Sequence, residues 1–289
     1  MATAQNDRSV SPWRVARLAI AGFTAHDMPT YAAALAYRVL FSLFPFIIFL
    51  TTLLGFLGLP GFFTWMQGQA AYLLPEQAME QVNAVMAELQ APRGGLMSVA
   101  IALALWSAST AVLGTMYALN VVYEVKERRA AWKRILVSIL YTLGLALMLV
   151  IAAATMIAGP EFLTWLTRYV GLDALFISVW AWVRWPIAAF LLLLVVAIVY
   201  YAAPNVKQPF RLITPGSVIA VSAWIAASIG FGIYVQSFAS YNKTYGSMGA
   251  VIVLLMYFFL SAAVMLFGAE VDATIARERG RPAREDEGR

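Results

Sequence analysis

Long apolar runs dominate this chain of 289 residues and restrict it to one class of fold. A helix that crosses a bilayer needs about 20 mostly apolar residues. The composition is 62% hydrophobic and 12% charged, whereas soluble domains are about 45–50% apolar and about 25% charged. We therefore expect an all-α, polytopic membrane helical bundle of six transmembrane helices, with spans at 35–58, 96–122, 135–158, 185–203, 215–238 and 248–270.

Three further segments have the character of interfacial helices. Ser11-Pro12-Trp13 places a cap residue and a proline at a helix start, so a helix on the cytoplasmic membrane surface is expected. The aromatic stretch 61–74 is expected at an interface, and an amphipathic helix from Pro75 should cover the outer face of the bundle. Residues 1–275 are thus predicted to form a single membrane domain, followed by a disordered cytoplasmic tail at 276–289.

The basic residues are distributed unevenly between the two sides of the predicted bundle. One side carries 15 of them and the other carries 4, while Arg38 lies within the first span. Because lysine and arginine accumulate on the cytoplasmic side, both termini are predicted to be cytoplasmic. The 15 are Arg8, Arg14, Arg17, Lys126, Arg128, Arg129, Lys133, Arg134, Lys207, Arg211, Arg277, Arg279, Arg281, Arg284 and Arg289. Since they are divided among four segments, they indicate topology and not a nucleic-acid surface.

Arg38 and Pro45 interrupt the first apolar run, and Ser42 shares their helix face. Two interpretations of Arg38 stay open. It snorkels to the cytoplasmic headgroups, or it forms an internal ion pair with a carboxylate of another helix. Pro45 removes one backbone donor and leaves a carbonyl one turn earlier to be satisfied, which Ser42 is placed to assist. This proline predicts either a static kink or a hinge.

Polar and small side chains form stripes on three other predicted spans. Such stripes either pack helices together through small residues and hydrogen bonds or line a wet cavity. Glu270 points about 200° away from Asp272 around a helix, so only one of the two is expected to face the interior. The stripes are Thr110, Gly114, Tyr117, Asn120 and Glu124; Trp224, Ser228, Gly232 and Gln236; and Tyr257, Ser261, Gly268 and Asp272. The candidate cavity residues are Arg38, Ser42, Tyr117, Asn120, Glu124, Gln236, Glu270 and Asp272, with Glu124, Glu270 and Asp272 as candidate partners of Arg38.

Residues suited to catalysis are scarce. The chain has no cysteine, which excludes disulfides and thiolate chemistry. Its one histidine, His26, is predicted to be a polar residue at the membrane edge, because a metal site or proton relay needs partners. No phosphate-binding loop or nucleophile motif is present. We therefore expect no enzyme, no catalytic residue, no metal and no cofactor.

Several segments together resemble the YihY/BrkB family of bacterial inner-membrane proteins. They are AAALAYRVLFSLFPFIIFL at 32–50, ALNVVYEV at 118–125, the YYAAPN exit at 200–205 and YNKTYGSMGAVIVLLMYFFLSAAVMLFGAEVDA at 241–273. The resemblance implies a six-helix inner-membrane protein, and some members have been called virulence or serum-resistance factors. The family has also carried a ribonuclease BN label, regarded as mistaken, and roles in envelope lipid movement have been proposed for it.

Three functions are weighed. The first is transport or translocation of a lipid or other amphiphile for envelope maintenance, favoured by the polar stripes and the interrupted first span. The second is a membrane scaffold or assembly partner, in which the same stripes are packing faces. Ribonuclease activity is disfavoured, because phosphodiester hydrolysis needs a positioned base or metal-binding carboxylates. The expected partners are membrane lipids, with a homo-oligomer or envelope proteins left open and nucleic acid excluded.

Overall fold

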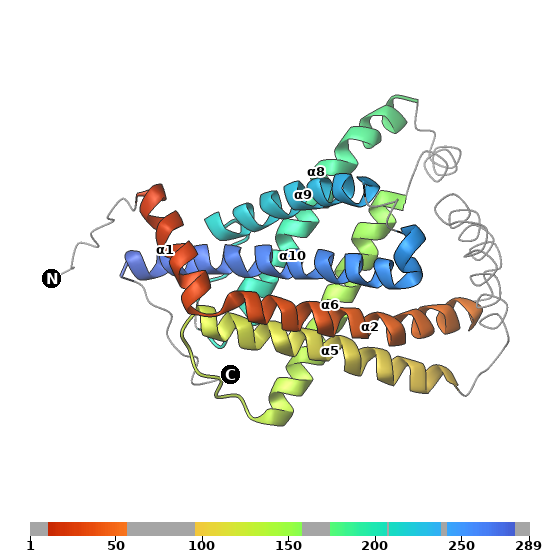
Figure 1. Cartoon of the computed structure of the whole chain (residues 1–289), viewed down its shortest axis with the longest axis horizontal. Coiled ribbons are helices and arrows are strands. Elements are labelled where there is room, and N and C mark those ends of the chain that lie inside the picture. Colours follow the sequence, from red (N-terminus) through yellow and green to blue (C-terminus); the bar gives the residue numbers. More distant parts are fainter. Residues whose placement is uncertain (1–10, 57–95, 158–173, 207, 238–241, 281–289) are drawn as a thin grey trace. The chain divides into compact units, whose positions relative to one another are not determined.

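The computed structural model describes residues 11–56, 96–157, 174–206, 208–237 and 242–280 (Figure 1). These residues form seven α-helices, so the predicted all-α class is confirmed for the described part of the chain. The helices are α1 (Pro12–Ala25), α2 (Met28–Phe56), α5 (Leu96–Val122), α6 (Ala131–Ile157), α8 (Ala174–Ala202), α9 (Pro215–Ser237) and α10 (Asn242–Glu278).

Five of the described helices contain a stretch long and apolar enough to cross a membrane, which fits a multi-pass membrane protein. These stretches are Ile101–Val122, Ala131–Met148, Trp182–Ala202, Pro215–Val235 and Val251–Glu278. The first predicted span, 35–58, falls mostly within α2, and its last two residues lie outside the described part. A count of six spans therefore stays a prediction. The interfacial segments predicted at 61–74 and from Pro75 also lie outside the described residues.

The chain divides into two compact units, which we treat separately. One comprises residues 1–37 and 112–289, and the other comprises residues 38–111. Within the first unit, α9 lies along α10, and α1 crosses α10 near its C-terminal end (Figure 1). α10 continues to Glu278, beyond the predicted domain limit at 275, and residues 281–289 of the predicted tail are not among those described.

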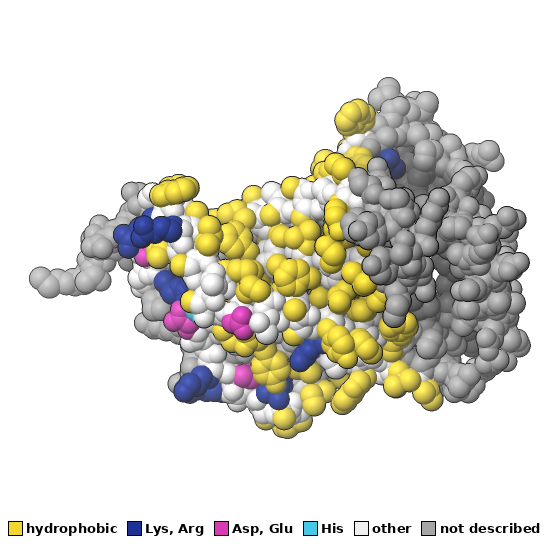
Figure 2. Space-filling view, viewed as in Figure 1, with side chains coloured by type: hydrophobic (Ala, Val, Ile, Leu, Met, Phe, Trp, Pro, Cys, Tyr) yellow, Lys and Arg dark blue, Asp and Glu magenta, His cyan; other side chains and the backbone are white. Residues whose placement is uncertain are grey.

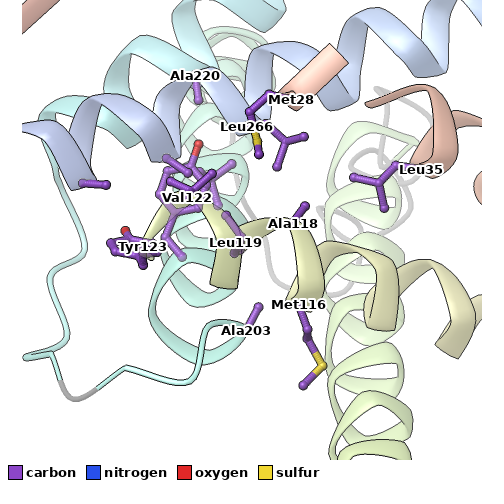
Figure 3. Packing of buried hydrophobic residues seen from close by; sticks show 14 of the residues in the cluster. Met28, Leu35, Met116, Ala118, Leu119, Val122, Tyr123, Ala203, Ala220 and Leu266 are labelled. Atoms are coloured by element: carbon purple, nitrogen blue, oxygen red, sulfur yellow. The ribbon is translucent and has the colours of Figure 1, made fainter. Parts of the chain in front are cut away.

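A buried apolar cluster joins α2, α5, α8, α9 and α10 within the first unit (Figure 3). Met28, Met116, Leu119 and Leu266 have no exposed surface, and Ala203 follows directly after α8. Burial of side chains of this size contributes about 1.5–3 kcal/mol each to folding in water. In a bilayer, where the hydrophobic effect between helices is absent, van der Waals packing of the same side chains stabilises the association of the helices. The cluster fixes the helix ends that surround the site described below.

The outward surface of the same unit is apolar, as expected for helices in contact with lipid. Trp182, Ile229 and Ile233 are more than half exposed. Figure 2 shows hydrophobic side chains spread over much of the described face, with charged side chains more frequent on the side where α1 lies. A soluble protein rarely exposes apolar patches of this extent, so this surface supports the membrane assignment.

The polar stripes on α9 and α10 face each other and form hydrogen-bonded contacts between the two helices. Trp224 Nε1 donates to Ser261 Oγ over 3.0 Å, and the Ser228 and Tyr257 hydroxyls are 3.1 Å apart. These bonds favour the packing interpretation of the two stripes and give no support to a wet cavity between them. Gly232 lies on an exposed part of α9, and the side chain of Gln236 is outside the described part of the chain.

The predicted helix at the N-terminal end is confirmed as α1, with a proline in its first turn. Ser11 occupies the N-cap position, but its side chain makes no capping hydrogen bond. Val15 and Ala19 pack against Val271 of α10. A helix lying on the membrane surface would turn all its apolar side chains toward lipid, whereas these two face the protein. The exposed face carries Trp13 and Ile20, which remain available to a membrane surface.

Candidate functional site

Four charged or titratable side chains meet at the end of α10 within the first unit. Nδ1 of His26 lies 3.0 Å from Oε2 of Glu270, and its Nε2 lies 3.6 Å from Oε1 of Glu124. Nη2 of Arg277 lies 2.5 Å from Oε1 of Glu270, and its Nη1 pairs with Glu124. Glu270 is fully buried, with 0% of its side chain exposed. We call these four residues the ionic cluster.

The local backbone explains how the ionic cluster forms. Glu270 and Arg277 are seven residues apart on α10, so two helical turns place them on one face. α1 ends at Ala25 and α2 begins at Met28, which leaves His26 in the break between two helices. Gly22 provides the space for Glu270, because a Cβ at this position would overlap Oε1 of the carboxylate.

Glu124 enters the ionic cluster from the C-terminal end of α5. The Val125 N–H donates to the Asn120 carbonyl and the Glu124 N–H to the Val121 carbonyl, which is the bond pattern of a Schellman motif. Glu124 takes the left-handed position of that motif, with φ 55°. Glycine is the usual residue there, so the glutamate occupies a backbone position that its own side chain does not favour.

Two members of the ionic cluster were not among the predicted site residues. His26 was predicted to be a lone polar residue at the membrane edge, but it faces two carboxylates that are distant in sequence. Arg277 was interpreted only as a topology signal, although its spacing of seven residues from Glu270 indicates that the two side chains share a helix face. The separation of 244 residues between His26 and Glu270 gives no sequence signal of any kind.

Asp272 faces a different neighbour from Glu270. Its Oδ2 accepts a hydrogen bond of 2.5 Å from the Thr214 hydroxyl, and its Oδ1 accepts one of 2.8 Å from the Gly216 N–H at the start of α9. The two carboxylates therefore face different helices, as their predicted separation of about 200° around the helix implies. Because α10 is covered by α1 on one side and by α9 on another, both find partners, as helix geometry allows.

A second polar network surrounds Asn120, which is buried. Its Oδ1 accepts the Asn205 N–H over 2.7 Å, and its Nδ2 donates to Oε2 of Glu127 over 2.9 Å. Glu127 also pairs with buried Arg129, and Arg129 Nη2 donates to the Ala203 carbonyl. Asn120 therefore links the segment that follows α5 to the segment that follows α8 through hydrogen bonds.

Two tyrosines near the end of α5 differ in their surroundings. Burial raises the pKa of the Tyr123 phenol well above its usual value, with the carboxylate of Asp272 adding to the shift, so this side chain stays neutral. Tyr117, a predicted cavity residue, is 37% exposed, and the Arg134 guanidinium lies over its ring at 5.2 Å. This cation–π contact ties α5 to the start of α6.

The Asn120 contacts lead to a stability prediction. Replacing Asn120 by leucine, which has a similar shape, should lower the free energy of unfolding by about 1–3 kcal/mol, because a buried N–H of Asn205 and the Glu127 carboxylate lose a partner. Ser138→Ala is the matched control, since this buried hydroxyl bonds only the Ile135 carbonyl of its own helix among the described residues. Thermal unfolding in detergent measures both. Equal small effects of the two variants would contradict a fastening role for Asn120.

The second unit contains the two residues that interrupt the first apolar run. Nη1 of Arg38 donates to the Thr110 carbonyl of α5 over 2.8 Å. α2 continues through Pro45, and the Ser42 hydroxyl donates to the Val39 carbonyl over 2.8 Å. The described contacts of Glu124, Glu270 and Asp272 are with other residues, as given above. Pairing of Arg38 with one of these carboxylates stays a prediction, as does a hinge at Pro45.

The chain matches a known protein family over most of its length. The family, described as virulence factor BrkB, matches residues 19–289. The chain belongs to the BrkB family. Among its relatives, the "putative ribonuclease-like protein YfkH" of Bacillus subtilis is 36% identical over 261 residues, which cover 90% of this chain and 94% of the relative. No solved structure matches the chain.

More distant relatives of this BrkB-family chain are named as membrane proteins. A "UPF0761 membrane protein" of Pseudomonas aeruginosa is 26% identical over 268 residues, which cover 89% of this chain and 61% of that protein. A UPF0761 membrane protein of Chromohalobacter salexigens is 28% identical over 285 residues, covering 92% of this chain and 64% of the relative. The chain thus spans less than two thirds of the length of these two relatives.

Three of the four segments that carry the family resemblance come together in the first unit. Asn120 of the 118–125 segment bonds Asn205 of the 200–205 segment. The hydroxyl of Tyr200 donates to the Met265 carbonyl, and Glu124 pairs with Arg277, which in turn holds Glu270. BrkB-family segments that are far apart in sequence therefore form two neighbouring polar networks at the helix ends.

Proposed function

We propose that the chain moves a lipid or other amphiphile in the bacterial inner membrane, with both termini cytoplasmic. The observation that carries the proposal is Arg38. This residue is partly exposed within a long apolar helix, and the partner of its guanidinium among the described residues is the neutral Thr110 carbonyl. That bond leaves the positive charge without a described counter-charge. Since a cation at membrane depth is costly, it is usually retained for a function.

The charge of Arg38 favours an amphiphile with an anionic headgroup. A guanidinium carries five N–H donors in a planar fork that fits phosphate oxygens two at a time. Among bacterial lipid chemistries, a phosphate-bearing headgroup combines an anion with the acyl chains that suit the apolar surface of the helices. The uneven distribution of basic residues supports the proposed orientation.

The experiment measures lipid movement directly. Full-length protein is reconstituted into vesicles containing a fluorescent phosphatidylglycerol or phosphatidylethanolamine, and a membrane-impermeant quencher reports the fraction that reaches the outer leaflet. We expect the protein to accelerate movement of the anionic lipid over protein-free vesicles. Arg38→Gln should reduce that rate roughly tenfold or more, because a charge-assisted hydrogen bond contributes about 1.5–3 kcal/mol. Arg38→Lys, which keeps the charge, should retain part of the rate.

The competing function is a membrane scaffold, and the hydrogen bonds between α9 and α10 favour it, because they use two polar stripes for static packing. A scaffold predicts that neither lipid moves faster with protein than without it. It also predicts that Arg38→Gln lowers the amount of protein in the membrane while leaving lipid movement unchanged. Mass spectrometry of lipids that copurify with the gently extracted chain would then show no preference for anionic headgroups.

A further inference from the structure

We propose that the ionic cluster is a proton-binding site, occupied when His26 is an imidazolium ion, and that the bound proton fixes α1 against α10. The four residues are His26, Glu124, Glu270 and Arg277. Proton binding at this site and lipid movement by the chain are separate properties, and either can hold without the other.

The placement of the His26 ring is the first support. Both of its nitrogens face carboxylate oxygens, Nδ1 at 3.0 Å from Glu270 and Nε2 at 3.6 Å from Glu124. A neutral imidazole donates from one nitrogen and presents a lone pair at the other. One lone pair would then face a carboxylate oxygen, which is repulsive. The imidazolium ion donates from both nitrogens, so the observed geometry is complementary to the protonated ring.

The charge balance is the second support. Glu124 and Glu270 contribute two negative charges, and the Arg277 guanidinium, which contacts both, contributes one positive charge. A proton on His26 makes the cluster neutral. Because Glu270 has 0% exposed side chain, water does not solvate its charge, and the compensation comes from Arg277 and the protonated His26. Asp27, the next residue after His26, accepts a hydrogen bond from Thr30 and is not part of the cluster.

The backbone at the site is the third support. Among the described residues, the non-glycine residues with positive φ are Asp27, at 54°, and Glu124, at 55°. The first lies next to His26 in the break between α1 and α2, and the second belongs to the ionic cluster. Left-handed backbone at a residue other than glycine is unfavourable and is typical of functional sites. Here one such position, Glu124, carries a cluster side chain, and the other, Asp27, directly follows His26.

Loss of the proton should loosen the C-terminal part of α1. Apart from the cluster, this part of α1 contacts α10 through the rings of Phe23 and Phe267, whose centroids are 5.9 Å apart. The start of α1 is held separately, by Val15 and Ala19 against Val271 and by Arg14 with Glu278. Because histidine changes its charge between about pH 5 and pH 8, the contact near His26 is suited to respond in the physiological range.

The decisive experiment uses the fact that His26 is the one histidine of the chain. Full-length protein, purified with a tag that lacks histidine, is labelled with ¹⁵N-histidine, and the two ring-nitrogen shifts are followed against pH. We expect the doubly protonated ring to persist to higher pH in the wild type than in Glu270→Gln, because this variant removes a carboxylate 3.0 Å from Nδ1. Asp27→Asn is the matched control and should titrate as the wild type. Identical titrations of the wild type, Glu270→Gln and Asp27→Asn would overturn the proposal.

A second measurement tests whether the proton fixes α1. Since the chain has no cysteine, Ala21→Cys on α1 and Ser222→Cys on α9 provide two exposed positions for spin labels. The distance distribution between them should broaden from pH 5.5 to pH 8.5. His26→Gln should remove this pH response, and Glu124→Gln, at a carboxylate that is 58% exposed, should weaken it. If the distance distribution of the spin-labelled protein that retains His26 and Glu124 did not change with pH, proton binding would not hold α1 against α10.

Discussion

Replacing Gly268 by alanine should separate α9 from α10 and lower the amount of folded protein severalfold. An added Cβ at Gly268 would lie 2.6 Å from the Gly216 carbonyl oxygen, 2.6 Å from the Tyr200 hydroxyl and 2.7 Å from the Ala220 Cβ. The first of these is backbone, so α9 itself must move. Overpacking of this kind costs about 1–3 kcal/mol and sometimes more.

The expected loss is larger than the clash alone, because the same helix crossing positions other contacts. The start of α9 is held by Asp272 through the Thr214 hydroxyl and the Gly216 N–H. If α9 shifts outward, these bonds lengthen and a carboxylate in the apolar part of α10 loses its donors. The Tyr200 hydroxyl, which donates to the Met265 carbonyl beside Gly268, is displaced as well.

Gly232→Ala provides the matched control for Gly268→Ala. Gly232 lies within α9, and an added Cβ there would meet nothing within 4 Å. Alanine favours a helix over glycine by about 0.5–1 kcal/mol in water, so this variant should be neutral or slightly more stable. Membrane abundance and the thermal unfolding midpoint in detergent compare the two. Similar behaviour of both alanine variants would contradict the close crossing of α9 and α10.

The sequence predicts the helices of this chain far better than it predicts their neighbours. Apolar runs set where helices form, because a bilayer leaves few other solutions for the backbone. The runs at 96–122 and 215–238 agree with α5 and α9 within a residue at each end. Which polar groups meet depends on helix rotation and pairing, and these follow from side-chain packing over the whole unit rather than from any local pattern.

The candidate residues show where this limit lies. Glu124 and Glu270 were selected because carboxylates in apolar spans are rare, and the structure brings both into one cluster. Arg38 was their candidate partner, on the grounds of similar depth, whereas their described partners are Arg277 and His26. Depth along a helix can be counted from sequence, but the direction a residue faces across the bundle cannot. His26 was missed for the same reason, since its partners lie on α10 and after α5.

Replacing Arg277 by methionine should destabilise the chain by about 3 kcal/mol or more. The buried Glu270 carboxylate would keep only His26 as a described charged partner, and removal of one member of a buried ion pair costs about 3–5 kcal/mol. Glu270→Met should cost less, because Arg277 is 33% exposed, can still pair with Glu124 and can reach water. Both free energies of unfolding are measured at neutral pH by denaturant titration in mixed micelles.

The double variant decides whether the effect comes from charge. Combining Arg277→Met with Glu270→Met removes the isolated buried charge, so the double variant should be more stable than Arg277→Met alone. Arg14→Met is the control, since Arg14 is 65% exposed in its pair with Glu278 and such pairs contribute about 0–1 kcal/mol. If the double variant were the least stable of all, lost packing and not an unpaired carboxylate would explain the result. If the double variant regained free energy of unfolding relative to Arg277→Met, the buried charge of Glu270 would be shown to destabilise the chain unless Arg277 and His26 compensate it.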